Sequence, residues 1–333
     1  LPEMAVGIYS RAVIFDHKSR QFFLVCPKSK RSEIECFLRD LIKSNNENKL
    51  SPLDFSLTSN WQSNMDKASY IEKFEQVQQY LLSGDCYQIN LAQRFSAQYQ
   101  GDEFQAYCAL RTENKAPFSA FMRFEHSAIL SVSPERFLQC KQGKVQSKPI
   151  KGTMPRNTDK AQDEQNAQRL ASSTKDRAEN LMIVDLLRND ISKSCQPGSV
   201  KVPKLFAVES FATVHHLVST VEGQLETGLH ALDLLRGCFP GGSITGAPKI
   251  RAMEIIEELE PNCRGAYCGS IGYIGYNGNM DTNIAIRTLV YSENTLRFWA
   301  GGGIVNDSVL ENEYQECFDK AQAIFNLLEQ LKH

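Results

Sequence analysis

The segment RFLQCKQGKVQSKPIKGT (residues 136–153) predicts two extended stretches that turn at Gln142-Gly143. Glycine in the turn suits a β-hairpin that pairs Arg136–Cys140 with Lys144–Ile150. Pro149 pushes the residue before it out of the helical region, which keeps this part of the chain extended. The segment therefore predicts antiparallel β structure in the middle of the chain.

A further strand pair and two helices are predicted around this hairpin. Phe118–Phe124 and Ser127–Val132 form the strand pair. Residues 67–83 carry their apolar side chains on one stripe, as an amphipathic helix does. Apolar residues surround Lys175–Asp190 almost completely, which predicts a buried helix.

The C-terminal part is predicted to be β and then α. Tyr267–Tyr276, Met280–Tyr291 and Thr295–Ala300 predict a three-stranded meander, because turn residues separate them. A final helix is predicted over Val309–Leu331. The whole pattern indicates an α/β (α+β) chain with mainly antiparallel sheets.

The composition is that of an ordinary globular protein, with 333 residues, of which 42% are hydrophobic and 23% charged. A net charge of −2 argues against a nucleic acid or an anionic membrane as partner. No apolar run approaches the ~20 residues that span a bilayer. The ten cysteines include no Cys-x-x-Cys pair and no signal peptide opens the chain, so a cytoplasmic protein with reduced thiols is expected. Because the chain begins with Leu1, it is expected to be a fragment or a trimmed form.

Lys151 is a candidate nucleophile. It lies in Pro149-Ile150-Lys151-Gly152-Thr153, where Gly152 permits a close backbone approach or an unusual turn. Glu135, in Ser133-Pro134-Glu135-Arg136, lies sixteen residues upstream and could donate a proton. The alternative is a surface lysine in a hairpin, which is the commoner fate of lysine.

Two predicted helices each carry a pair of acids at i, i+3: Asp176 with Glu179, and Glu313 with Glu316. If the pairs face each other, four carboxylates converge, and oxygen ligands without Cys or His suit Mg²⁺. The alternative is that the acids face solvent or favour the helix N-terminus. Arg287, Lys320 and two glycine-rich loops, residues 239–249 and 301–303, offer ways to hold substrate carboxylates.

Taken together, these motifs resemble the chorismate-utilising enzymes over roughly residues 65–328. The resemblance rests on seven stretches in order: Ser133–Phe137, Pro149–Thr153, Lys175–Asp190, Gly242–Lys249, Ala285–Thr288, Gly301–Val305 and Glu313–Lys320. It implies a single domain of antiparallel sheets stacked face to face with helices outside, over residues 61–333. Residues 1–60 would be the remnant of an N-terminal region packed on that domain.

Two positions indicate the branch of the family. Isochorismate and salicylate synthases carry a lysine base where this chain has Gln88, so ammonia rather than water is the expected nucleophile. Anthranilate synthases carry alanine where this chain has Lys151, which favours amination of chorismate at C4 to give 4-amino-4-deoxychorismate, on the p-aminobenzoate and folate route. The alternatives are anthranilate synthase component I and a chorismate-binding subunit without turnover.

The resemblance also implies a role for each site residue. Lys151 would attack C2 of chorismate and Glu135 would act as general acid, while Glu179, Glu316, Asp176 and Glu313 would hold Mg²⁺. The substrate would be bound by Gln88, Gly152, Thr153, His216, Thr245, Tyr267, Arg287, Gly301, Gly302, Gly303 and Lys320. A separate glutamine amidotransferase subunit would supply ammonia. Some family members bind tryptophan remotely, which here would involve Pro117, Phe118 and Ser119.

Overall fold

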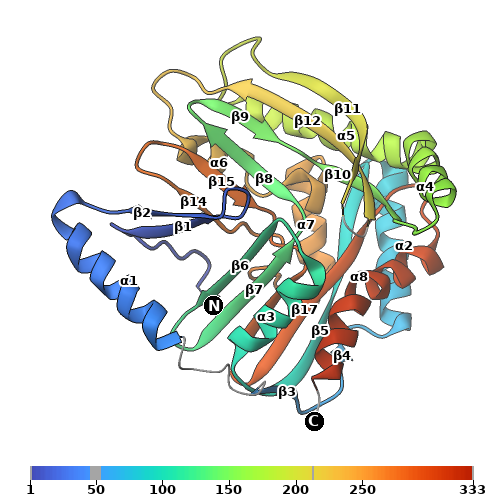
Figure 1. Cartoon of the computed structure of the whole chain (residues 1–333). Coiled ribbons are helices and arrows are strands. Elements are labelled where there is room, and N and C mark those ends of the chain that lie inside the picture. The colour runs from blue at the N-terminus through green and yellow to red at the C-terminus, as the bar shows by residue number, and fades with distance from the viewer. Residues whose placement is uncertain (1, 46–53, 212–213, 332–333) are drawn as a thin grey trace. The chain divides into compact units, whose positions relative to one another are not determined.

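The computed structural model describes residues 2–45, 54–211 and 214–331 of the protein. The chain forms two compact units, Leu1–Asp54 and Phe55–His333. The first unit contains a hairpin of β1 (Ala12–Asp16) and β2 (Gln21–Val25), a short 3-10 turn and α1 (Arg31–Asn45) (Figure 1). That the N-terminal residues pack on the main domain stays a prediction.

One sheet of the second unit has the strand order β10-β12-β9-β8-β15-β14, with β11 paired to β12. All of its described pairs are antiparallel. Its strands are β8 (Arg136–Lys141), β9 (Lys144–Ser147), β10 (Ile150–Pro155), β11 (Lys201–Ser210), β12 (Val214–Gln224), β14 (Gly272–Ile274) and β15 (Met280–Asn283).

The other sheet has the order β13-β5-β17-β16-β7-β6, and β3 and β4 also pair with β5. It too is antiparallel at every described pair. Its strands are β3 (Phe55–Leu57), β4 (Gln62–Ser63), β5 (Gln88–Gly101), β6 (Phe118–Arg123), β7 (Ser127–Ser133), β13 (Gly246–Ala247), β16 (Thr288–Ser292) and β17 (Thr295–Ile304).

The helices of this unit begin at side chains that satisfy free backbone N–H groups. Asp66 accepts from the N–H of Ser69 at the start of α2, and Asp102 accepts from that of Phe104 at the start of α3. Gly84, with φ of 80°, ends α2 in the left-handed conformation. The helices are α2 (Lys67–Ser83), α3 (Glu103–Asn114), α4 (Lys160–Ser172), α5 (Thr174–Ser192), α6 (Ala231–Cys238), α7 (Lys249–Leu259) and α8 (Leu310–Gln330).

Three hydrophobic clusters hold the layers together. The first lies between the sheets, since it joins Leu138 and Val221 of one to Val290 and Trp299 of the other, and α5 and α6 add to it. The second packs α3 and α8 on β5, β7, β16 and β17. The third packs α2 and α7 against the start of β5. The stacked antiparallel sheets with helices around them, visible in Figure 1, confirm the predicted fold class.

The predicted three-stranded meander is wrong. Met280–Tyr291 is not one strand: β15 pairs with β8 in one sheet, and β16 pairs with β7 and β17 in the other. Arg287, at φ of 48°, lies between the two strands and breaks the extended conformation. Of Tyr267–Tyr276, only Gly272–Ile274 forms a strand. The chain thus crosses from one sheet to the other just where it carries Arg287.

The helix predicted as fully buried is amphipathic instead. α5 buries Ile183, Val184 and Leu187 against the sheets, while Leu181 is 52% exposed. Apolar residues around a helix do not by themselves decide burial, because only one face of α5 meets the core.

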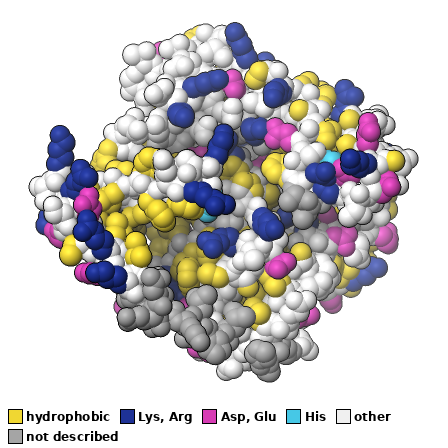
Figure 2. Space-filling view, in the orientation of Figure 1, with side chains coloured by type: hydrophobic (Ala, Val, Ile, Leu, Met, Phe, Trp, Pro, Cys, Tyr) yellow, Lys and Arg dark blue, Asp and Glu magenta, His cyan; other side chains and the backbone are white. Residues whose placement is uncertain are grey.

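The described helices and the visible face bear on the expected absence of membrane and nucleic-acid partners. Within the described residues, none of the helices has the length and apolar character needed to cross a bilayer. Figure 2 shows basic side chains scattered over the visible face among acidic and hydrophobic ones.

Leu130→Ala is expected to destabilise the protein strongly. Leu130 is fully buried in the cluster beneath α3 and α8, so its truncation leaves a cavity and should lower the free energy of unfolding by ~2–5 kcal/mol. Leu82→Ala is the matched control, because Leu82 is 76% exposed, and it should change that energy by less than about 0.5 kcal/mol. Urea titration measures both, and equal effects would contradict the assigned core.

Candidate active site

A cavity of about 580 Å³ in the second unit is lined by residues from both sheets and from α5 and α8. It collects residues that lie far apart in the sequence. The predicted site residues in its wall are Glu135, Lys151, Gly152, Thr153, Asp176, Glu179, His216, Tyr267, Arg287, Gly301, Gly303, Glu313, Glu316 and Lys320.

Three predicted substrate-binding residues are outside this lining. Gln88 is fully buried where β5 pairs with β13, and its amide has no hydrogen-bond partner among the described residues. Thr245 is buried and donates to the carbonyl of Gly241. Gly302 lies behind the carboxylates: a Cβ there would be 3.0 Å from Glu313 Oε2, so glycine leaves room for the acid.

Glu135 is a buried carboxyl group at the turn between β7 and β8, with 5% of its surface exposed. Its backbone N–H donates to Ser133 Oγ, and its carbonyl accepts from the N–H of Ile284, which fixes the turn. Ser243 Oγ donates to Glu135 Oε1 at 3.1 Å. Burial raises the pKa of Glu135 to about 7, although the charge of Lys151 and the Ser243 hydrogen bond oppose the rise. Glu135 can therefore carry a proton near neutral pH.

Lys151 reaches the cavity from an irregular part of β10. The register with β12 shifts between Lys151 and Thr153, and Gly152 between them has φ of 75°. A Cβ at Gly152 would lie 2.8 Å from the Asp176 carboxyl carbon, so position 152 also needs glycine for space. The Lys151 side chain is 15% exposed, and its Nζ is 3.8 Å from Glu179 Oε2.

His216 is a neutral polar group on the cavity wall. Its Nδ1 is 2.9 Å from Thr153 Oγ1, and Phe211 packs edge-on against its ring. Burial lowers the pKa of His216 to about 4, and the charge of Arg287 adds to this effect. At neutral pH the imidazole can exchange hydrogen bonds without adding charge.

The four acids of the two helices all face this cavity, and lysines surround them. Lys175 Nζ lies 3.9 Å from Glu179 Oε1 and 3.6 Å from Glu313 Oε1. Lys320 Nζ lies 2.6 Å from Glu316 Oε1. Within the described ranges, no group of three or more His, Cys, Asp or Glu side chains is arranged to hold a metal ion.

The two glutamates nearest these lysines differ in proton affinity. Burial raises the pKa of Glu179 against the opposing charges of Lys151 and Lys175, and the weaker effects of Asp176 and Glu313 add to the rise. Burial also acts on Glu316, but the charge and hydrogen bond of Lys320 outweigh it and lower the Glu316 pKa. Burial therefore dominates the proton affinity of Glu179, while the nearby lysines dominate that of Glu316.

Arg287 presents a guanidinium to the cavity. Burial lowers its pKa, and its side chain forms no hydrogen bond or ion pair with the part of the chain that the structure describes. Lys320, across the cavity, also donates to the carbonyl of Gly301. A cation without a partner among the described residues, in the same cavity as a second cation, is suited to bind an anionic substrate.

Sequence reasoning missed two residues of this site. Ser243 lines the cavity and bonds Glu135, and Lys175 bridges the acids of α5 and α8. The Lys175–Glu179 spacing of i, i+4 was a readable signal. The sequence around Ser243 contains no such signal beyond the position of this residue in the glycine-rich loop.

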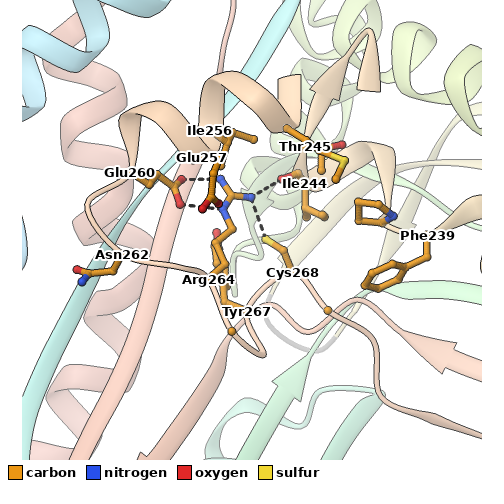
Figure 3. Close-up of a pocket in the computed structure, with 14 residues that line it drawn as sticks. Phe239, Ile244, Thr245, Ile256, Glu257, Glu260, Asn262, Arg264, Tyr267 and Cys268 are labelled. Carbon is orange, nitrogen blue, oxygen red and sulfur yellow. Dashed lines mark hydrogen bonds and ion pairs between the residues drawn. The ribbon is translucent and has the colours of Figure 1, made fainter. Parts of the chain in front are cut away.

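A smaller cavity of about 200 Å³ lies behind the same loop and shares Ile244 and Tyr267 with the larger one. Figure 3 shows Arg264 at its centre, where the guanidinium forms an ion pair with Glu260 and donates to the Ile244 carbonyl and Cys268 Sγ. The guanidinium also lies over the ring of Tyr267. Arg264 therefore fixes the wall between the two cavities.

The predicted tryptophan-site residues are outside both cavities. Phe118 begins β6, and the Arg136 guanidinium lies 5.1 Å from its ring centre. Ser119 Oγ donates to the carbonyl of Ala116. A ligand next to Pro117, Phe118 and Ser119 stays a prediction.

Comparison with known proteins relates the chain to enzymes that act on chorismate. The family described as chorismate binding enzyme matches residues 1–326. Aminodeoxychorismate synthase component 1 of Escherichia coli (strain K12) is 58% identical over 330 residues, which cover 99% of this chain and 71% of that protein. The protein of the same name from Klebsiella aerogenes is 56% identical over 332 residues, with 99% and 71% covered.

A solved structure supports the same relationship. Anthranilate synthase component I from Streptococcus pneumoniae TIGR4 matches with a TM-score of 0.85 and 35% identity, covering 95% of this chain and 72% of that one. These matches confirm the resemblance and the fold that the sequence motifs predicted.

Glu135→Gln is expected to change how stability depends on pH. The pKa of Glu135 rises from 4.5 to about 7 on folding, so the stability that this group contributes is complete below about pH 4.5 and is lost as pH rises through 7. Glutamine does not titrate. The variant should therefore gain about 2–3 kcal/mol relative to wild type between about pH 5 and pH 8.

Urea unfolding of the variant and of the wild type, at about pH 5 and again at about pH 8, measures this gain in the free energy of unfolding. Glu293→Gln is the control, because Glu293 is an exposed turn residue. Its difference from wild type should be the same at both pH values. A constant difference for Glu135→Gln as well would mean that Glu135 keeps an ordinary pKa.

Proposed function

The chain belongs to the chorismate binding enzyme family, and from this premise we propose that it aminates chorismate at C4 with ammonia, giving 4-amino-4-deoxychorismate and water. The observation that carries the proposal is that Lys151 and the buried Glu135 line one cavity with Arg287, whose guanidinium has no partner in the part of the chain that the structure describes. A nucleophile, a carboxyl group able to hold a proton near pH 7 and anion-binding groups are what this displacement requires.

The residue at 151 supports the C4 branch over the C2 branch. Lysine there supplies a side-chain nucleophile, whereas the alanine of anthranilate synthases does not. The relatives at 56% and 58% identity are named aminodeoxychorismate synthase component 1, and the related anthranilate synthase structure is 35% identical. Anthranilate among the products would favour the other branch.

Chorismate carries two carboxylates, and the cavity offers separate positive groups for them. Arg287 would bind one, and Lys320 with the backbone of Gly301 and Gly303 would bind near the other. His216, neutral and bonded to Thr153, would line the ring without competing for charge.

Mg²⁺ is proposed to bind among Glu179, Glu316, Asp176 and Glu313. Their oxygens are the ligands that Mg²⁺ prefers. Burial raises the pKa of Glu179, and a cation bound there would favour its carboxylate form. Some of these carboxylates would have to turn from their lysine partners. Bound there, the ion would neutralise and hold a substrate carboxylate.

In the first half of the proposed reaction, Lys151 acts as nucleophile and Glu135 as acid. Neutral Lys151 Nζ forms a bond to C2, the ring double bonds shift from C1=C2 and C5=C6 to C1=C6 and C4=C5, and the C4–O bond breaks. Glu135 gives its proton to the departing oxygen, which leaves as water. Lys151 is then a substituted ammonium and Glu135 a carboxylate.

In the second half, ammonia bonds to C4, the double bonds return to C1=C2 and C5=C6, and the C2–N bond breaks. Lys151 leaves as a neutral amine, and Glu135 takes a proton from the new C4 ammonium group. Atoms and charges balance to chorismate plus ammonia giving product plus water. The C4 substituent is thus replaced through two successive displacements. Their stereochemical effects cancel, which explains why the configuration at C4 is retained.

Ammonia would be supplied by a glutamine amidotransferase subunit, which the component numbering of the relatives' names supports. A cytoplasmic location and a bound tryptophan near Phe118 belong to the same proposal.

Lys151→Ala is expected to abolish formation of 4-amino-4-deoxychorismate or divert amination to C2. The variant keeps Glu135 and the acids but lacks the nucleophile. Incubation with chorismate, Mg²⁺ and ammonium followed by mass analysis of products measures this. Lys148→Ala is the matched control, since Lys148 is on the same segment and pairs with Glu209 outside the cavity lining. Unchanged product from Lys151→Ala would remove the covalent role of Lys151.

Glu316→Gln is expected to raise the Mg²⁺ concentration for half-maximal activity by roughly tenfold or more, because a charged ligand becomes neutral. Glu329→Gln, an exposed position on the same helix, should leave it unchanged. A Mg²⁺ titration of turnover measures both. Equal Mg²⁺ requirements in the two variants would place the ion elsewhere.

A further inference from the structure

Ser243 contributes a hydroxyl group to the cavity at the position of the proposed general acid. It lies in the 3-10 turn η2 (Gly242–Ile244), and its Oγ donates to Glu135 Oε1 at 3.1 Å. Ser243 itself lines the cavity. The hydroxyl therefore lies between the loop and the carboxyl group that the reaction needs protonated.

The loop that carries Ser243 is held on three sides. Lys249 Nζ donates to the buried carboxylate of Asp190 on α5 and to the carbonyl of Cys238. Arg264 donates to the carbonyl of Ile244, the residue after Ser243 (Figure 3). Thr245 Oγ1 closes the turn on the carbonyl of Gly241. Such support fixes the direction of the Ser243 hydroxyl.

Packing leaves this loop little freedom to move away. A Cβ at Gly242 would lie 2.4 Å from the Leu186 side chain of α5, so backbone and helix are in close contact next to Ser243. Ile244, on its other side, is 6% exposed. The Ser243–Glu135 contact thus comes from a rigid element, as an oriented catalytic group requires.

The charged groups that act on Glu135 come from other elements. Lys151 of β10 exerts the largest charge effect, and Lys320 of α8 a smaller one. Neither is within ion-pair distance of the Glu135 carboxyl group in the described structure. Ser243 is the described side chain that hydrogen-bonds Glu135. A hydrogen bond from the backbone of Ile150 has a smaller effect in the same direction.

We propose that Ser243 is a positioning residue for the general acid: its hydroxyl occupies Glu135 Oε1 and so keeps the transferable proton on Oε2. The inference rests on the proposed amination. In a carboxylic acid only one oxygen carries the proton, and the oxygen that accepts from a fixed donor is the unprotonated one. In the first half-reaction the Oε2–H bond breaks and the proton goes to the C4 oxygen, while Ser243 continues to donate to the carboxylate formed.

Ser243→Ala is expected to lower kcat roughly tenfold, as a misdirected proton reduces the benefit of general acid catalysis. It should also move the pH profile. Donation from Ser243 favours the carboxylate, so its loss raises the pKa of Glu135 and keeps the acid protonated to higher pH. The ratio of variant to wild-type kcat should therefore rise with pH above about 7.

The ratio is taken at each pH with the same saturating chorismate, Mg²⁺ and total ammonium, because the fraction of free ammonia then cancels. Ser243→Thr keeps a hydroxyl group and should restore both kcat and the profile. Ser243→Cys, with a weak thiol donor, should lie between alanine and wild type.

Two results would overturn the positioning role: a folded Ser243→Ala whose ratio does not change with pH, or a folded Ser243→Thr no better than alanine. Failure of Ser243→Ala to fold, seen by thermal unfolding, would also overturn it in favour of a structural role. Absence of aminated product from the wild-type chain would instead overturn the proposed function, and the inference with it.

Discussion

The cavity depends on the pairing of β5 with β17. Ala92 pairs with Gly301 and Asn90 with Gly303 in this ladder. A Cβ at Gly301 would lie 2.2 Å from the carbonyl oxygen of Leu91, so the two backbones can meet only at glycine. With the backbones this close, β17 brings its glycines to the cavity wall and α8, packed on β17, brings its acids over them.

Burial gives the carboxylates of one cavity different proton affinities. Glu135 has few compensating contacts, and its pKa rises to about 7. Glu316, equally part of the wall, has a lowered pKa because Lys320 outweighs burial. For Glu135 and Glu316 this separation suits the proposed roles, since a proton donor must be protonated and a metal ligand must not. The lysines between the helices therefore serve the proposed chemistry as much as the fold.

The sequence could predict what is local and not what depends on sheet assignment. Lys151 with Gly152, the acid pairs and the turn of the β8–β9 hairpin depend on short motifs. The second strand of that hairpin was predicted to reach Ile150 but ends at Ser147, and Ile150 begins β10, which pairs with β12. Which sheet a strand joins is set by the core between the sheets, and the local pattern does not show that core. The sequence therefore predicts one strand over Met280–Tyr291, whereas the structure has two strands in different sheets, separated at Arg287. The sequence pattern does not predict α3, because the apolar stripe of this helix is short, although Asp102 marks its start. Ser243 became visible only through its contact with Glu135.

The position of Lys151 in the sheet explains how one side chain could select the branch of chemistry. A regular strand sends successive side chains to opposite faces, yet Lys151, Gly152 and Thr153 all line the cavity. The register shift between Lys151 and Thr153 makes this possible, and β10 is at the end of its sheet's strand order. A residue at a bulge on an edge strand can change size and charge while the ladder of β12 stays intact. In the proposed reaction, gaining a nucleophile at 151 therefore requires no rearrangement of the fold that holds Glu135.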